Sequence, residues 1–215
     1  MNRLVQQVLL WTFVTGLSLP VLSQEQFNYW DYGDGTCILR GFTNKYSVVT
    51  IPSSINGLVV TVIGPDAFFY CVNLTSVILP SSITNIWDDT FLWIESRLAN
   101  ITVESSNLFY SSNAGVLFDK SQTTLIRCPN GMSGSYAVPA GVTSIRDNAF
   151  NGCFTLTNVT ISSSVTSIGE HSFQNCRFIN MAIPNSVTSI GYQAFSCNNS
   201  LTSVIIPSSV TNLGD

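Results

Sequence analysis

His171 is the only histidine of this chain, and it stands beside Glu170. Together with one of the many serines, a histidine could act as the general base that activates a hydroxyl for nucleophilic attack. The chain repeats itself, however, and several kinds of polar residue occupy the positions that correspond to His171: Asp66, Asp89, Asn148 and Gln193. This exchange among polar residues is typical of an exposed turn rather than of a catalytic base.

Other patterns that support catalysis are missing from the sequence. It has no G-x-S-x-G motif, no glycine-rich loop of the kind that holds phosphate, and no clustered pair of catalytic carboxylates. Asp31 and Asp34 could suggest a calcium loop, but the series of ligands that such a loop needs is incomplete. We therefore expect no catalytic residue, no metal site and no cofactor, and we predict that the chain is not an enzyme.

Cysteines are the other candidates for chemistry. Four of the six follow a phenylalanine by two or three residues: Cys71, Cys153, Cys176 and Cys197. This regular spacing predicts buried free thiols, because cysteine packs as a small apolar residue. An exported chain would permit disulfides between neighbouring coils, but parallel side chains in one register make the bond geometry unfavourable. Cys37 and Cys128 fall outside the register without an evident partner, and the absence of C-x-x-C argues against zinc.

Four N-x-S/T sequences are present, at Asn73, Asn100, Asn158 and Asn198. Three of them fall near the start of a predicted strand, so the repeat itself generates them. They would carry glycans only in a eukaryotic secretory pathway.

The elements that position all these residues are copies of one repeat. Its clearest copy, LTNVTISSSVTSIGEHSFQNC, runs from Leu156 to Cys176, and other copies start at Leu74, Phe178 and Leu201. The period is visible in one column, since Ile145, Ile168, Ile190 and Leu213 recur at intervals of 23, 22 and 23 residues. Periods of 20–50 residues indicate a solenoid or a related array.

Each copy has the same local plan. Alternating apolar residues predict a short strand with one buried face, so Val159, Met181 and Val204 should line one core. Proline ends several of these strands because it cannot extend the hydrogen-bond ladder. A second extended piece follows, then a glycine that we expect to form a turn, at Gly169, Gly191 and Gly214.

A single copy cannot fold alone. Its apolar side chains, about six per copy, contribute roughly 1.5–3 kcal/mol each when buried. Ordering the backbone costs roughly 1–2 kcal/mol for each of about 23 residues. Stability therefore requires stacked copies that share a core and strand hydrogen bonds.

The L-x-x-V-x-I spacing, the shared SVTSIG block and the A/S-F-x-x-C ending resemble the BspA-type leucine-rich repeat, a bacterial surface variant of the leucine-rich solenoid. The resemblance covers roughly residues 50–215. Ser164 and Ser209 stand where many leucine-rich repeats carry an asparagine, so a regular asparagine ladder is not expected. We predict a mainly β repeat solenoid, a leucine-rich-repeat-like right-handed coil of about 23-residue repeats with short parallel strands and little helix.

Composition excludes some partners. Only 9% of the residues are charged and the formal net charge is −4, so the basic surface that nucleic acid needs is missing. No later stretch approaches the length of a membrane span, so we expect no span in the mature chain. Residues 1–23 are a predicted signal peptide, with Arg3 before an apolar run and Ser23 before the expected cleavage at Gln24. The alternative is an uncleaved anchor, for which the run is short.

Two further segments are predicted in the mature chain. Residues 24–50 read as an N-terminal cap hairpin, since Asp34-Gly35 between apolar runs favours a turn and a terminal coil must be covered. Residues 51–215 read as the leucine-rich repeat solenoid, whose last repeat is incomplete.

One copy, at about residues 98–132, is long and irregular. Its apolar runs Val116–Phe118 and Thr124–Ile126 are separated by polar residues, which indicates a hairpin insert.

We predict an exported, non-enzymatic module, secreted or displayed at the cell surface, that is a monomer and binds extended partners through its strand face. The resemblance implies protein or extracellular matrix partners and an adhesion role. The candidate binding residues are the outward strand positions: Thr75, Ser76, Ile78, Thr157, Asn158, Thr160, Ile179, Asn180, Ala182, Thr202, Ser203 and Ile205. The alternatives are a structural spacer in a larger surface protein, or the non-catalytic part of a secreted enzyme.

Overall fold

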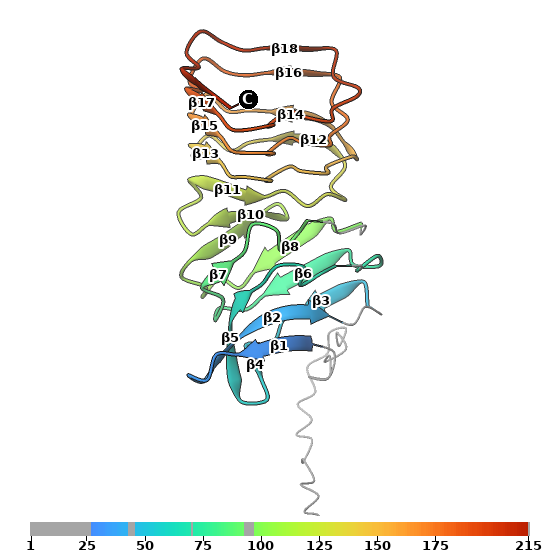
Figure 1. Ribbon diagram of the computed structural model, residues 1–215, viewed down its shortest axis with the longest axis vertical. Helices are drawn as coiled ribbons and strands as arrows, with labels where there is room; N and C mark the ends of the chain where they lie inside the picture. The colour runs from blue at the N-terminus through green and yellow to red at the C-terminus, as the bar shows by residue number, and fades with distance from the viewer. Residues whose placement is uncertain (1–26, 43–45, 70, 93–96, 215) are drawn as a thin grey trace, which may run out of the picture.

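The computed structural model shows a β-solenoid of about seven turns, with the N-terminal coil at one end and the C-terminal coil at the other (Figure 1). No helix is present among the residues that the structure describes. These are residues 27–42, 46–69, 71–92 and 97–214. The predicted signal peptide and the cleavage point at Gln24 lie outside them. The solenoid and its period of about 23 residues confirm the predicted fold class.

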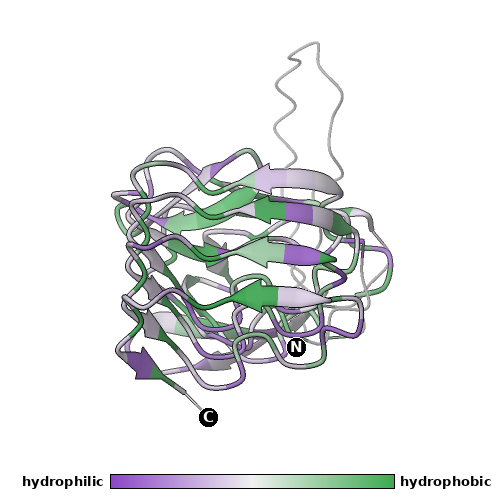
Figure 2. Cartoon of the chain, turned by 90° about the horizontal axis from the view of Figure 1, so that it is seen from above, coloured by the Kyte–Doolittle hydropathy of each residue, from purple (hydrophilic) through white to green (hydrophobic). Residues whose placement is uncertain are grey.

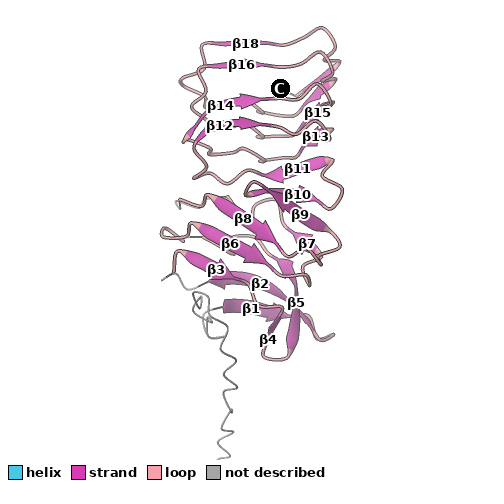
Figure 3. Cartoon of the chain, turned by 180° about the vertical axis from the view of Figure 1, so that it is seen from behind, coloured by secondary structure: helices cyan, strands magenta, loops and turns pink. Residues whose placement is uncertain are grey.

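Strands on one side of the coil form what we call the first strand column (Figures 1 and 3). It consists of β3 (Val48–Thr50), β6 (Ser76–Leu79), β8 (Asn100–Val103), β12 (Gly134–Ala137), β14 (Leu156–Thr160), β16 (Asn180–Ala182) and β18 (Ser203–Ile205). The hydrogen-bonded pairs are all parallel and fall into three groups: β3–β6–β8, β12–β14 and β16–β18.

The second strand column lies on another side of the coil. It consists of β2 (Thr36–Phe42), β5 (Leu58–Ile63), β7 (Asn85–Ile86), β9 (Tyr110–Asn113), β10 (Val116–Asp119), β11 (Thr124–Arg127), β13 (Ser144–Ile145), β15 (Ser167–Ile168), β17 (Ser189–Ile190) and β19 (Asn212–Leu213). From β11 to β19 the strands are parallel, and Ile145, Ile168, Ile190 and Leu213 lie side by side in register. The repeat seen in the sequence is therefore the register of this sheet.

Four strand pairs depart from the parallel order: β1 (Phe27–Asp31) with β2, β4 (Ser54–Ile55) with β5, β9 with β10 and β10 with β11. At the N-terminal end, β1 pairs antiparallel with β2 across a turn in which Gly33 and Gly35 have positive φ. In the irregular repeat, β9, β10 and β11 form an antiparallel meander, and its first turn places Ala114 and Gly115 at positive φ. A further short strand, β4, turns through Asn56 and Gly57 to pair antiparallel with β5.

The glycines after the second column do not form the turns that the sequence suggested. A Cβ atom on Gly191 would lie 2.5 Å from the backbone nitrogen of Glu170 in the preceding coil, and Gly169 and Gly214 are equally crowded. Glycine is needed there because only a residue without a side chain lets adjacent coils approach. The left-handed turn comes two residues later, at His171 and Gln193, with φ of 51° and 49°.

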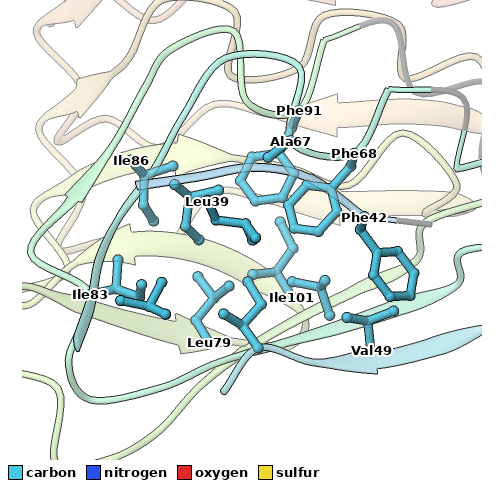
Figure 4. Close-up of a cluster of buried hydrophobic side chains, with 14 of the residues drawn as sticks. Leu39, Phe42, Val49, Ala67, Phe68, Leu79, Ile83, Ile86, Phe91 and Ile101 are labelled. Atoms are coloured by element: carbon cyan, nitrogen blue, oxygen red, sulfur yellow. The ribbon is translucent and has the colours of Figure 1, made fainter. Parts of the chain in front are cut away.

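Seen end-on, the backbone winds around the inside of the coil (Figure 2), and buried apolar side chains fill that inside as the core. The core has two clusters, one in the N-terminal repeats (Figure 4) and one from Val116 onward. Stacked phenylalanine rings run through both. Phe68 stacks on Phe91 with ring centroids 5.5 Å apart. In the second cluster Phe173 stacks on Phe150 at 4.9 Å and on Phe195 at 5.6 Å.

Arg127 joins the two clusters at the irregular repeat, where no phenylalanine continues the stack. Its guanidinium is buried and donates hydrogen bonds to the backbone oxygens of Phe91 and Asn151, each at 3.0 Å, and to that of Asn148. These acceptors lie in the coils on either side. Burial lowers the pKa of Arg127, because removal from water disfavours the charged guanidinium.

Candidate functional site

The strand face of the C-terminal coils is formed by the outward residues of β14, β16 and β18. Their inward partners are apolar: Val159 and Met181 are buried and Val204 packs against the same cluster. The prediction that these three residues line one core is confirmed. Because side chains alternate along a strand, the residues between them must point to solvent.

Outward side chains form rows across these strands. Asn180 lies beside Ser203 and Ala182 beside Ile205 in the register of β16 and β18. All nine candidate residues that lie in these three strands or directly before them are exposed: Thr157, Asn158, Thr160, Ile179, Asn180, Ala182, Thr202, Ser203 and Ile205. Two of them are large and apolar, since Ile179 is 61% exposed and Ile205 is 76% exposed. We call these nine residues the strand face.

Threonine hydroxyls at the start of the strands also hold the coils together. Thr157 donates a hydrogen bond to the backbone oxygen of Gly134 at 3.0 Å, and Thr202 donates one to Ile179 at 3.1 Å. In the N-terminal half Thr75 does the same with Ser47 at 2.9 Å. These threonines are therefore parts of the scaffold, and their hydroxyl hydrogens are not free for a partner.

The first three candidates do not join the strand face. Thr75, Ser76 and Ile78 are only partly exposed and belong to the separate β3–β6–β8 group. The insert lies at the edge of that group, because the backbone nitrogen of Ile101 in β8 donates to the oxygen of Gly115 at 2.9 Å. The single continuous surface that the sequence suggested is thus divided at the irregular repeat.

The strand face carries no charged side chain. The side chain of Asn158 has no hydrogen bond within the described part of the chain, whereas the side-chain oxygen of Asn180 accepts one from the Thr202 hydroxyl at 3.2 Å. The nearest basic group in the sequence is Arg177, whose guanidinium lies 5.8 Å from the ring centre of Phe154. Binding here would rest on amide hydrogen bonds and apolar contact, so it should depend little on salt.

His171 lies at a turn and lines a hollow together with amide side chains. His171 adopts a left-handed turn, and its ring lies edge-on to Tyr192 with centroids 5.6 Å apart. It lines a hollow of about 260 Å³ whose other lining residues are Leu92, Asn148, Asn151, Gln174 and Asn175. None of these supplies a carboxylate or a nucleophile.

No group of three or more metal-binding side chains occurs among the described residues. Asp31 and Asp34 instead hold the turn of the cap hairpin. Asp31 accepts a hydrogen bond from the backbone nitrogen of Gly33 at 2.7 Å, and Asp34 accepts two from Thr36. The side-chain hydrogen bond from Thr36 lowers the pKa of Asp34.

All six cysteines are free, and five of them are buried. Burial raises the pKa of the Cys71 thiol to about 11. Cys197, however, is exposed, so the prediction that it is a buried thiol is wrong. It follows its phenylalanine by two residues rather than three, and Asn198 takes the position that Cys176 takes one coil earlier.

The serines expected in place of an asparagine ladder form their own hydrogen bonds between coils. Ser164 donates to the backbone oxygen of Val142 at 2.7 Å, and Ser209 donates to Val187 at 2.8 Å. Sequence reasoning missed Arg127 and the hydroxyl contacts, because neither follows from apolar periodicity.

The described part of the chain contains no helix with the length and apolar character needed to cross a bilayer.

A family model described as "BspA type Leucine rich repeat region" matches residues 41–135 and 133–215, with six copies. No curated protein matches the chain. Several solved structures share the fold. The pneumococcal vaccine antigen PcpA has a TM-score of 0.68 at 24% identity, over 80% of this chain and 48% of that one. This chain therefore spans about half of that structure.

Two further solved structures, both of bacterial proteins, are similar to this chain. A leucine-rich repeat protein from Eubacterium ventriosum has a TM-score of 0.57 at 19% identity, covering 87% of this chain and 70% of that one. A leucine rich cell surface protein from Faecalibacterium prausnitzii has a TM-score of 0.50 at 21% identity, covering 87% and 54%. At these identities the likeness shows the fold.

Proposed function

The chain belongs to the BspA-type leucine-rich repeat family, and on that premise we propose that it is an exported, non-enzymatic module that binds a protein or matrix partner through its strand face. Repeats of this kind commonly mediate protein interactions. A solenoid offers repeated, regularly spaced strands that suit an extended partner. The fold alone does not imply this function, so the proposal depends on the character of the strand face.

The observation that carries the proposal is the exposed apolar and amide surface on β14, β16 and β18. Ile179 and Ile205 are exposed on the same face as Asn158 and Asn180, and the strand face that they share has no charged residue. Fixed strands hold these groups in place, so a partner would order few side chains of this protein on binding. Depletion of charge together with exposed apolar side chains is typical of the centre of a protein interface.

The predicted signal peptide is one reason to propose a surface role. The sequence begins with the predicted signal peptide, residues 1–23, and one solved structure of this fold is described as a cell surface protein. We propose secretion or display at the cell surface, as a monomer.

The test is binding of the purified full chain to a panel of immobilised extracellular matrix proteins, measured by surface plasmon resonance at two salt concentrations. We expect at least one saturable interaction whose affinity changes little between about 50 and 300 mM salt, because the strand face is uncharged. An interaction that disappears at high salt would place binding on a charged surface and contradict the proposal. Failure to bind any protein would favour the spacer role instead.

A further inference from the structure

A second candidate binding site lies on the other side of the molecule, at the N-terminal end of the second strand column. Three aromatic side chains there are exposed: Trp30 is 62% exposed, Tyr32 49% and Trp87 48%. They surround a hollow of about 430 Å³, which Ile38, Arg40 and Pro65 complete. That volume is typical of a ligand pocket. We call these six residues the aromatic hollow.

Three adjacent strands position the aromatic hollow. Trp30 lies beside Ile38 across β1 and β2, and β2 in turn pairs with β5. Trp87 follows β7, and its backbone nitrogen donates to the oxygen of Ile63 in β5 at 3.1 Å. The two indoles therefore stand on opposite sides of β2 and β5.

The side chain of Ile38 forms the floor of the hollow, and Gly64 leaves room for it. A Cβ atom on Gly64 would lie 2.7 Å from Cδ1 of Ile38, so only glycine lets the isoleucine side chain lie flat between the two strands. Ile38 is buried as a result, although it points to the outer face of β2. The hollow thus has an apolar floor and aromatic walls.

The polar groups of the aromatic hollow are almost entirely hydrogen-bond donors. The two indole N–H groups and the guanidinium of Arg40 can donate but not accept, and the Tyr32 hydroxyl alone can do both. Within the described residues none of these groups has a hydrogen bond or an ion pair. A ligand must therefore present acceptors, apolar rings or side chains, and a negative charge.

We propose that the aromatic hollow binds a proline-rich peptide segment that carries an acidic residue. Proline has no backbone N–H, so such a segment offers carbonyl acceptors with few donors that need partners. Its extended left-handed helix is preformed and has no internal hydrogen bonds, and aromatic-lined grooves bind it in other proteins. The acidic side chain would pair with Arg40. A saccharide fits less well, because each sugar hydroxyl also donates and the hollow offers almost no acceptors.

The probe is a fluorescein-labelled nonapeptide of three Pro-Pro-Glu units, titrated with the full chain and followed by anisotropy. Two peptides serve as controls: three Ala-Ala-Glu units keep the charge without the polyproline helix, and three Pro-Pro-Lys units keep the helix with the opposite charge. We expect the Pro-Pro-Glu peptide to bind about tenfold more tightly than either control.

Variants locate the binding. Trp30→Ala and Trp87→Ala should each weaken it about tenfold or more, because tryptophan anchors carry much of an interface's affinity. Phe154→Ala, which removes an exposed ring elsewhere, is the matched control and should bind as wild type. Arg40→Glu should weaken binding of the Pro-Pro-Glu peptide and strengthen binding of the Pro-Pro-Lys peptide, which also shows that the variant is folded.

The proposal is overturned if Pro-Pro-Glu binds no better than Ala-Ala-Glu, or if both tryptophan variants bind as wild type. Displacement of the peptide by oligogalacturonate at lower concentration than unlabelled peptide would assign the hollow to acidic saccharides instead. A double variant of the strand face, Asn158→Arg with Asn180→Arg, should leave peptide binding unchanged. This site is therefore tested independently of the proposed function.

Discussion

The side-chain amide of Asn198 donates a hydrogen bond to the backbone oxygen of Phe173, one coil earlier, at 2.8 Å. One coil before that, the Cys176 thiol donates to the oxygen of Phe150 at 3.2 Å. Asn198 also accepts a hydrogen bond from the backbone nitrogen of Cys176 at 2.8 Å. A thiol and an amide at equivalent positions thus both donate a hydrogen bond to the phenylalanine carbonyl of the preceding coil.

Asn198→Ala should lower the free energy of unfolding by about 1–3 kcal/mol, because it leaves a partly buried carbonyl and an amide nitrogen without partners. The matched control is Asn199→Ala, the exposed neighbouring residue, which should change it by less than about 0.5 kcal/mol. Urea denaturation followed by circular dichroism measures both. Equal midpoints for the two variants would contradict a structural role for Asn198.

Phe173→Ala should cost roughly 3–5 kcal/mol, since it removes a buried ring stacked between Phe150 and Phe195 and leaves a cavity. The exposed ring of Phe154 provides the control: Phe154→Ala should cost less than about 1 kcal/mol. Melting temperatures report the difference. A Phe173→Ala protein that melts with the wild type would mean that the phenylalanine stack does not stabilise the coil.

Arg127→Met should separate the unfolding of the two core clusters. The change keeps an apolar stem but removes the donors to the backbone oxygens of Phe91, Asn148 and Asn151. Each unpaired buried carbonyl costs about 1–3 kcal/mol. Because nearest-neighbour contacts stabilise a solenoid, weakening one interface should produce two unfolding steps. A single transition with the wild-type midpoint would show that Arg127 does not couple the clusters.

The thiols should differ in reactivity and make stability fall at high pH. Cys197 is exposed and should react with Ellman's reagent in the native protein, whereas the five buried cysteines should react only on unfolding.

Burial raises the pKa of Cys71 to about 11. The unfolded thiol ionises near pH 8.5 while the folded one stays protonated, so the unfolded state binds fewer protons above that pH. This contribution is full below about pH 8.5 and is lost as the pH rises toward 11.

Denaturation midpoints measured between pH 7 and 10.5 test the predicted loss of stability at high pH. Replacing Cys71 with Ala should reduce the decline. Reaction of more than one thiol of the native protein with Ellman's reagent would contradict the burial of the other five.

Much of the fold could be predicted because its determinants repeat. The isoleucine column of Ile145, Ile168 and Ile190 and the 23-residue spacing of Phe150 and Phe173 are visible in the sequence, and each corresponds to a ladder or a stack. Several copies of the repeat predict the same contact, so an atypical residue in one copy does not prevent the prediction.

The site was less predictable because its decisive features occur once. The contact between Ile101 and Gly115 that divides the outward surface depends on how one irregular repeat folds. Arg127 is buried by carbonyls from two other coils, which no local pattern specifies. Cys197 is exposed because it follows its phenylalanine by two residues rather than three, a difference that the general repeat pattern does not reveal. Trp30 and Trp87 lie 57 residues apart in the sequence and meet only through the pairing of β1, β2, β5 and β7.

The most direct test of the proposed function compares a strand-face variant with a matched control against whichever matrix protein the full chain binds. The variant is Asn158→Arg with Asn180→Arg, and the control is Asn73→Arg with Asn199→Arg, which places the same two charges on exposed asparagines outside the strand face. Surface substitutions of this kind change stability by only about 0.5 kcal/mol, so both proteins should melt as wild type. We predict that the strand-face variant binds at least about tenfold more weakly while the control binds as wild type. Equal binding by the two variants would contradict the account and show that the strand face is not the binding site.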